Sequence, residues 1–355
     1  KIVYDVRLNA VVVLRKLEMP VAGGDPCVGS TFLFNKIIER RIFIAKTFLT
    51  YEQQLQFLET QKNLIISDHI YAKRILKELS YYSLISGYKS PFKYISSNKY
   101  LPGVTFEELV AFYYFDEELR TLFLKYLLHV ERHIKSMFSY FFCQKYGENQ
   151  AAYLDIQNYN YNKKTQFQIQ RLIQTLHKSI ALPSQYRYIT HYSVIYHNIP
   201  LWVTSNVLTF GQISKMYQYA TTDIRSQISK TFNGISEKQL HQFITIAARC
   251  RNVCAHGERL YSFQINESIP DTLLHQKLQI MKKKNNYICG KNDLFAVVIA
   301  LRYLISQEDF KILKANLRKL INNVLSQCPH LTKNKLLSEM GFPENWENIS
   351  RYRKI

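Results

Sequence analysis

An arginine, a carboxamide and a histidine lie within six residues of one another in the stretch Arg251-Asn252-Val253-Cys254-Ala255-His256. Histidine exchanges protons readily because its ordinary pKa lies near neutrality. Arginine is permanently charged, and its planar fork of donors matches a phosphate. These groups could cleave RNA by attack of the RNA's own 2′-hydroxyl, with proton transfer by His256 and stabilisation of the pentacoordinate phosphate by Arg251. That chemistry requires no cofactor.

The spacing places these side chains at the end of a helix. Asn252 and His256 are four residues apart and share a helical face, where Asn252 would orient the histidine or the phosphate. Arg251 would be splayed from His256 in a regular helix, so we expect the helix to end just before Gly257, which lets His256 turn back. The alternative is an ordinary helix end with Arg251 and Asn252 as capping residues. Spacing alone does not separate the two interpretations.

One histidine is too few for a reaction that needs both an acid and a base. Two copies of the stretch that face each other across a homodimer interface would supply both, so we predict a composite site in a homodimer. Cys250, Cys254 and His256 resemble three metal ligands, but no second cluster completes a site of recognised spacing. We therefore predict no metal.

The composition favours a polyanionic partner. The 355 residues include 47 Lys and Arg against 27 Asp and Glu, a formal net charge of +20, which suits nucleic acid or an anionic membrane surface. The 47% of hydrophobic residues exclude a mainly disordered chain. No apolar run approaches the roughly 18 residues of a transmembrane helix, and we expect no membrane association. Six scattered cysteines favour a reducing cytoplasm.

The hydrophobic pattern predicts an all-α fold with four regions. Residues 1–30 form a leader that we exclude from the fold argument. Residues 31–100 read as a small basic N-terminal helical module, 101–265 as a helical bundle core, and 266–355 as a basic C-terminal helical region. Thr50 with Gln53 and Thr105 with Glu108 resemble capping boxes. No Gly or Pro occurs from residue 104 to 146, which predicts one long helix, whereas 181–200 is loop-like.

Several cations outside the central stretch are candidates for RNA binding. Lys125 and Arg132 belong to a polar stripe along the long helix, which is either an RNA groove or simply its solvated face. The same helix carries two pairs with i,i+4 spacing, Asp116 with Arg120 and Glu131 with Lys135. The remaining candidates are Arg249 and Arg259, which flank the central stretch, and the basic run Lys282, Lys283 and Lys284.

The central stretch matches the R-x4-H motif, with a polar residue after the arginine, of HEPN-domain ribonucleases. The string RNVCAHGERL at 251–260 resembles the signature of Abi (abortive infection) proteins of the AbiD/AbiF type. Three further blocks agree in order, so that the resemblance covers about residues 50–263: YYSLISGYKSPF at 81–92, FYYFDEELRTLFLKYLLHVERHIKS at 112–136 and PLWVTSNVLTFGQISKMY at 200–217.

The resemblance implies a bacterial phage-defence protein with a HEPN-like helical core and the activity of an RNA-cleaving toxin. By position, Arg251 and His256 would be the catalytic pair and Asn252 their polar support. Many members carry a second histidine or another polar residue at the position of Gly257. The glycine therefore leaves fewer polar side chains around the catalytic pair. The resemblance also implies a small structured noncoding RNA as partner. A noncatalytic RNA-binding module in a toxin–antitoxin-like ribonucleoprotein is the alternative, and a membrane or phage-protein sensor is a third.

Overall fold

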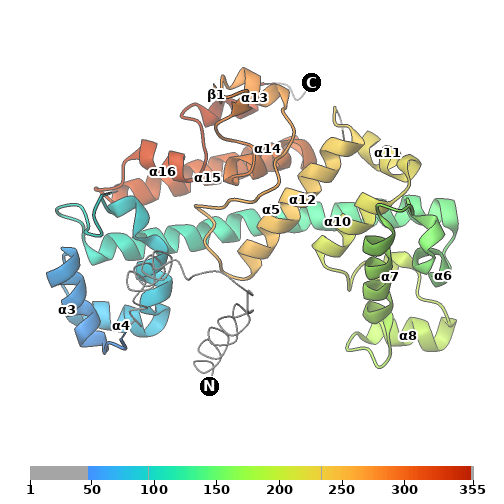
Figure 1. The fold of residues 1–355 in the computed structure, drawn as a ribbon, viewed down its shortest axis with the longest axis horizontal. Coiled ribbons are helices and arrows are strands. Elements are labelled where there is room, and N and C mark those ends of the chain that lie inside the picture. The colour runs from blue at the N-terminus through green and yellow to red at the C-terminus, as the bar shows by residue number, and fades with distance from the viewer. Residues whose placement is uncertain (1–46, 95, 233, 353–355) are drawn as a thin grey trace, which may run out of the picture. The chain divides into compact units, whose positions relative to one another are not determined.

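The computed structural model of the chain describes residues 47–94, 96–232 and 234–352, which are mostly helical (Figure 1). This confirms the predicted all-α class. Residues 50–355 form one compact unit. The predicted leader, 1–30, lies outside the described residues. The predicted boundaries near 100 and 265 stay predictions. Within the described part of the chain, no helix is long and apolar enough to span a membrane.

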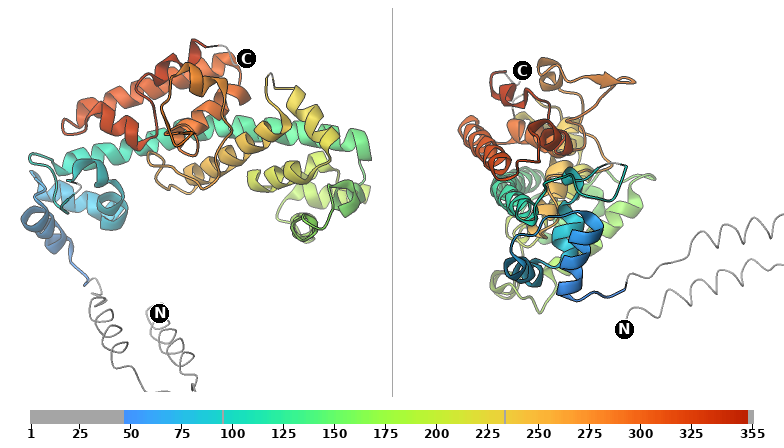
Figure 2. Two further views of the ribbon diagram at one scale, coloured as in Figure 1. Left: turned by 45° about the horizontal axis from the view of Figure 1, so that its top comes forward. Right: turned by 90° about the vertical axis from the view of Figure 1, so that its left-hand side faces the viewer.

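The long helix α5, Phe106–Tyr146, is the element against which the others pack. It runs for 41 residues because Gly and Pro are absent between the Thr105–Glu108 capping box and Gly147, as the sequence predicts. Its apolar stripe, from Leu119 to Phe142, is buried. Figures 1 and 2 show α5 crossing the compact unit, with α12 and α15 packed along it.

The elements before and after α5 follow in chain order. Before it come α3 (Tyr51–Lys62), α4 (His69–Leu79), the π-helix η1 (Tyr82–Ser86) and η2 (Ser90–Phe92). Between α5 and α12 lie α6 (Gln150–Leu154), η3 (Ile156–Asn158), α7 (Gln166–Ile180), α8 (Arg187–Tyr196), α9 (Leu201–Thr204), α10 (Phe210–Tyr219) and α11 (Thr222–Lys230). After α12 (Glu237–Ala255) come α13 (Leu273–Lys277), β1 (Lys282–Lys283), β2 (Asn286–Tyr287), α14 (Leu294–Leu304), α15 (Gln307–Gln327), α16 (Lys333–Glu339) and η4 (Trp346–Ser350).

Two segments differ from the sequence-based expectation. The stretch 181–200, expected to be loop-like, contains the helix α8, because Ile189 is buried in a small apolar cluster with Ile199 and Val203. The basic run at 282–284 lies in the region expected to be helical, but it is not part of a helix. Lys282 and Lys283 form β1, which pairs antiparallel with β2 across a turn whose residues Lys284 and Asn285 adopt positive φ.

Candidate functional site

The helix α12 carries the central stretch to a well-defined end. It begins with a capping box from Ser236 and buries Leu240, Phe243, Ile244 and Ala247. It ends at Ala255, where the His256 N–H donates to the Asn252 carbonyl at 2.9 Å. Gly257 follows with φ +68°, a left-handed conformation that glycine adopts without strain. The predicted helix end before Gly257 is therefore confirmed.

Arg251 is held by a carboxylate on α5. Its Nε donates to Glu131 Oε2 at 3.1 Å, and Lys135 Nζ lies 2.9 Å from the other oxygen, Glu131 Oε1. The Glu131 residue is only 5% exposed, so its charge is compensated by these two cations. The terminal Nη atoms of Arg251 form no hydrogen bond with any described residue, and its side chain is 27% exposed. The guanidinium is thus oriented through one edge and open at the other.

Asn252 and His256 are exposed at the same helix end. Neither side chain forms a hydrogen bond with a described residue. His256 is exposed and occupies the C-cap with φ −94° and ψ 4°, and its expected turn towards Arg251 stays a prediction. The structure brings the three residues to one helix end without a hydrogen bond between their side chains.

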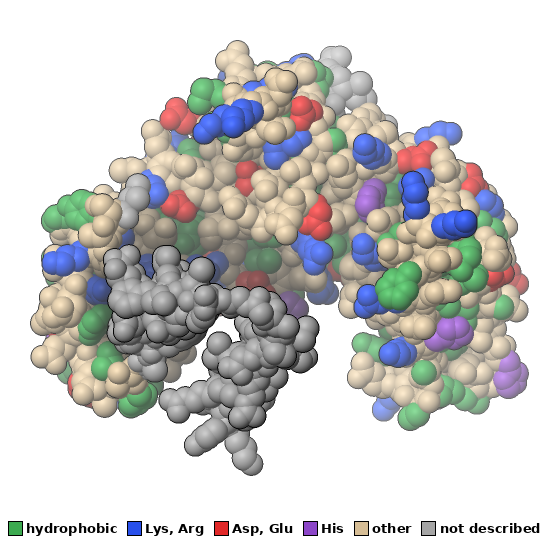
Figure 3. All heavy atoms as spheres, in the orientation of Figure 1, with side chains coloured by type: hydrophobic (Ala, Val, Ile, Leu, Met, Phe, Trp, Pro, Cys, Tyr) green, Lys and Arg blue, Asp and Glu red, His purple; other side chains and the backbone are tan. Residues whose placement is uncertain are grey.

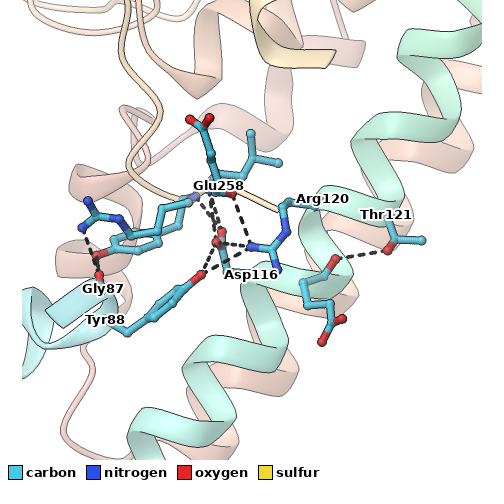
Figure 4. A network of polar contacts seen from close by, with 10 residues as sticks. Gly87, Tyr88, Asp116, Arg120, Thr121 and Glu258 are labelled. Carbon is cyan, nitrogen blue, oxygen red and sulfur yellow. Dashed lines mark hydrogen bonds and ion pairs between the residues drawn. The ribbon is translucent and has the colours of Figure 1, made fainter. Parts of the chain in front are cut away.

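Asp116 fixes the chain directly after the motif (Figure 4). This fully buried carboxylate accepts the N–H groups of Leu260 at 3.1 Å and Tyr261 at 2.7 Å, the Tyr88 hydroxyl at 2.8 Å and Arg120 Nη1 at 2.7 Å. Burial raises the pKa of the Asp116 carboxyl, while Arg120 and the hydrogen bonds oppose that rise. Burial and the neighbouring Asp116 also raise the pKa of Tyr88, so its hydroxyl stays protonated and donates.

The sequence spacing predicts the Asp116–Arg120 pair but not its role. Arg120 Nη1 also lies 3.4 Å from the Glu258 carbonyl oxygen, so both members of the pair hold the segment that follows His256. No residue pattern signals this contact, because Arg120 and Glu258 lie 138 residues apart in the sequence. The second predicted pair, Glu131 with Lys135, is also confirmed and acquires Arg251 as a third member.

A pocket of about 410 Å³ opens beside the end of α12. Its lining includes Tyr82 and Ser86 of η1, Tyr113 of α5, and Val253 and Gly257 at the end of α12. Arg259 also lines it, with Nη1 donating to the Gly87 carbonyl at 3.2 Å. Hydroxyls, aromatic edges and a guanidinium next to Gly257 could accommodate part of a nucleotide.

The other predicted RNA-binding residues are distributed over several surfaces. Arg249 faces Glu267 at 3.7 Å, and Lys125 lies 5.3 Å from the Tyr126 ring centroid. The β1–β2 hairpin, with Lys282, Lys283 and Lys284 exposed, lies beside α13 and away from the C-terminal end of α12 (Figure 1). Figure 3 shows Lys and Arg spread over one face, several of them over α7, α10 and α11. The structure gathers Arg259 at the motif but not the hairpin lysines.

The cysteines near the motif do not form a metal centre in the described part of the chain, where no group of three His, Cys, Asp or Glu could hold an ion. Burial raises the pKa of Cys250 well above its ordinary range, and the Cys254 thiol contributes to this rise. A protonated thiol is a poor ligand.

The family model of the Abi-like proteins matches residues 74–262. The chain belongs to the Abi-like protein family. The match runs from α4 through α5 and α12 to the Tyr261 contact, so it includes both the Asp116 network and the Arg251–His256 stretch. No curated protein and no solved structure matches the chain. Membership of the Abi-like family supports a role in abortive-infection defence against phage.

Proposed function

We propose that this Abi-like protein is a metal-independent endoribonuclease toxin of the HEPN type that acts in the cytoplasm. The observation that carries the proposal is the geometry at Arg251. Its Nε is held by a buried carboxylate, while its terminal donors remain open beside the exposed Asn252 and His256. Such a guanidinium suits a phosphate whose charge increases in the transition state.

In the proposed reaction, the 2′-oxygen of one nucleotide attacks the adjacent phosphorus. The P–O2′ bond forms and the P–O5′ bond breaks. One histidine takes the proton from the 2′-hydroxyl, and a second protonates the departing 5′-oxygen. The products are a 2′,3′-cyclic phosphate and a 5′-hydroxyl. Arg251 binds the pentacoordinate phosphate, and Asn252 orients the histidine or a phosphate oxygen.

The second histidine would come from a second copy of the chain. His256 lies at the surface, and its side chain forms no hydrogen bond with any described residue, which is compatible with an interface. We infer a homodimer whose two α12 ends share one composite site. A small structured noncoding RNA is the proposed restraining partner, in keeping with the net charge of +20.

The test is cleavage of a labelled single-stranded RNA with a chelator present. His256→Ala should abolish cleavage and retain RNA binding, whereas His197→Ala, at an exposed histidine after α8, should change neither. The product ends should be 2′,3′-cyclic phosphate and 5′-hydroxyl. Unchanged cleavage by His256→Ala would exclude the mechanism.

The composite site has its own test. Excess His256→Ala chain, exchanged into the wild-type dimer, should lower cleavage per wild-type chain because each mixed dimer has one histidine. A monomeric mass in light scattering together with full activity would contradict the shared site.

A noncatalytic RNA-binding module is the second candidate. The observation that favours it is that no hydrogen bond joins the His256 and Arg251 side chains. In that case His256→Ala would leave both RNA affinity and the cellular phenotype unchanged, and the protein would co-purify with an uncut RNA.

A further inference from the structure

A second, larger pocket lies on α5 beyond the Glu131–Lys135 pair. It has a volume of about 890 Å³ and is formed by one face of α5, from Arg132 to Gln144, and by α9 with the residues after it. Lys135 belongs to both places, because it pairs with Glu131 and lines the pocket. The lining residue Lys135 therefore lies one helical turn from the carboxylate that holds Arg251.

The chemistry of this lining is distributed along the helix. Arg132 and Lys135 stand at the end near Glu131, and Glu148 lies at the far end. Between them are two large exposed rings, Trp202 at 47% and Tyr140 at 59% exposure. A phosphate would be attracted to the cationic end and repelled from the carboxylate, so an anionic ligand has one preferred orientation.

We propose that this pocket binds one unpaired nucleotide of the RNA next to the one held at Arg251. The base stacks on Trp202 or Tyr140, and its phosphate contacts Arg132 and Lys135. Aromatic rings beside cations are the usual arrangement for unpaired RNA. The inference rests on the proposed function only in requiring that RNA is the ligand; it does not require cleavage.

Tryptophan fluorescence tests this directly, because the chain has two tryptophans, Trp202 and Trp346. Trp346 is 1% exposed, so it reports folding rather than ligand contact. A short, fluorescein-labelled single-stranded RNA of mixed sequence is titrated into the His256→Ala protein, which prevents cleavage. Anisotropy gives RNA binding, and tryptophan emission gives contact with the pocket.

The expected result is quenching of the emission in step with the anisotropy, retained in Trp346→Phe and lost in Trp202→Leu. Trp202→Leu should weaken RNA binding about 5- to 100-fold, and Trp202→Phe much less, because a phenyl ring still stacks. Native Trp346 emission in Trp202→Leu would show that the variant is folded. Arg132→Ala should weaken binding and reduce its dependence on salt.

Other outcomes separate this inference from the proposed function. RNA binding without quenching would overturn the pocket and leave the nuclease intact, whereas no RNA binding would overturn both. Quenching without cleavage by the wild-type protein would support the pocket and refute the nuclease. Emission that changes with protein concentration alone would indicate that a second copy covers Trp202, and would overturn the inference.

Discussion

Replacing Glu131 by glutamine tests whether the orientation of Arg251 is built into the fold. The carboxylate accepts from Arg251 Nε through one oxygen and from Lys135 Nζ through the other. Glutamine keeps the shape of the side chain but offers one carbonyl oxygen and one NH2 group. One of the two hydrogen bonds is therefore lost, and the other keeps its cationic donor but loses its anionic acceptor.

The magnitude follows from burial. The side chains of Glu131, Lys135 and Arg251 are 7%, 14% and 27% exposed, so solvent screens the cluster only partly. A hydrogen bond to a charged group contributes about 1.5–3 kcal/mol, and we expect Glu131→Gln to lower the free energy of unfolding by roughly 2–4 kcal/mol. If the guanidinium also shifts by about 1 Å, cleavage should fall on the order of 100-fold.

Urea denaturation gives the free energy of unfolding, and cleavage is measured under conditions in which each variant is fully folded. The matched control is Glu267→Gln at the neighbouring Arg249, where both side chains are more than half exposed and lie 3.7 Å apart. That change should cost less than about 1 kcal/mol and leave cleavage unchanged. If Glu131→Gln is no more harmful than the control, Glu131 does not position Arg251.

Three other perturbations test the segment after the motif and the C-terminal region. Asp116→Asn should lower the free energy of unfolding by about 3–5 kcal/mol because Arg120 is left buried without its counter-ion. If the decrease is smaller than that expected from removal of an exposed ion pair, Asp116 does not hold the segment after the motif. Gly257→Ala should lower the free energy of unfolding by about 1–2 kcal/mol, since φ is +68° and no atom obstructs the added methyl group. In the same urea denaturation experiment, Gly211→Ala in α10 should leave the free energy of unfolding unchanged or raise it. Burial lowers the pKa of His275, whose neutral ring donates to the Gly290 carbonyl. Below the ordinary histidine pKa of about 6.5, the unfolded chain binds a proton that the folded chain excludes. The free energy of unfolding should therefore decline as the pH falls below that value. His275→Gln should flatten that decline in urea midpoints measured across pH, and an unchanged slope would exclude His275 as its source.

The helices could be predicted where the sequence carries local signals. Thr105 with Glu108 and the distant Gly147 fix the two ends of α5, and both signals depend on residues within one turn of the end. The helix α8 was missed because its apolar side is short, and its one buried side chain, Ile189, packs against residues that follow α8. The β1–β2 hairpin was missed because lysine and asparagine have low strand propensity.

In the candidate site, too, the features set by local signals could be predicted and the long-range contacts could not. The end of α12 at Gly257 follows from local backbone preference and could be predicted. The pairing of Arg251 with Glu131 joins residues 120 positions apart, and nothing in either neighbourhood indicates the other. The i,i+4 spacing identified Glu131 as a partner of Lys135 alone. The pocket beside Trp202 likewise requires α9 to return to α5, which is a tertiary contact.

Two long-range contacts with α5, one at Arg251 and one at Leu260, hold the two ends of the stretch that carries Asn252 and His256. Arg251 contacts Glu131 on α5, whereas Leu260 contacts Asp116, which lies about 22 Å from Glu131 towards the N-terminus of the same helix. The segment is thus fixed at both ends by buried carboxylates. Between these points, the side chains of Asn252 and His256 have no hydrogen-bonding partner in the described residues. In the proposed reaction, a bound RNA or a second α12 end would orient them.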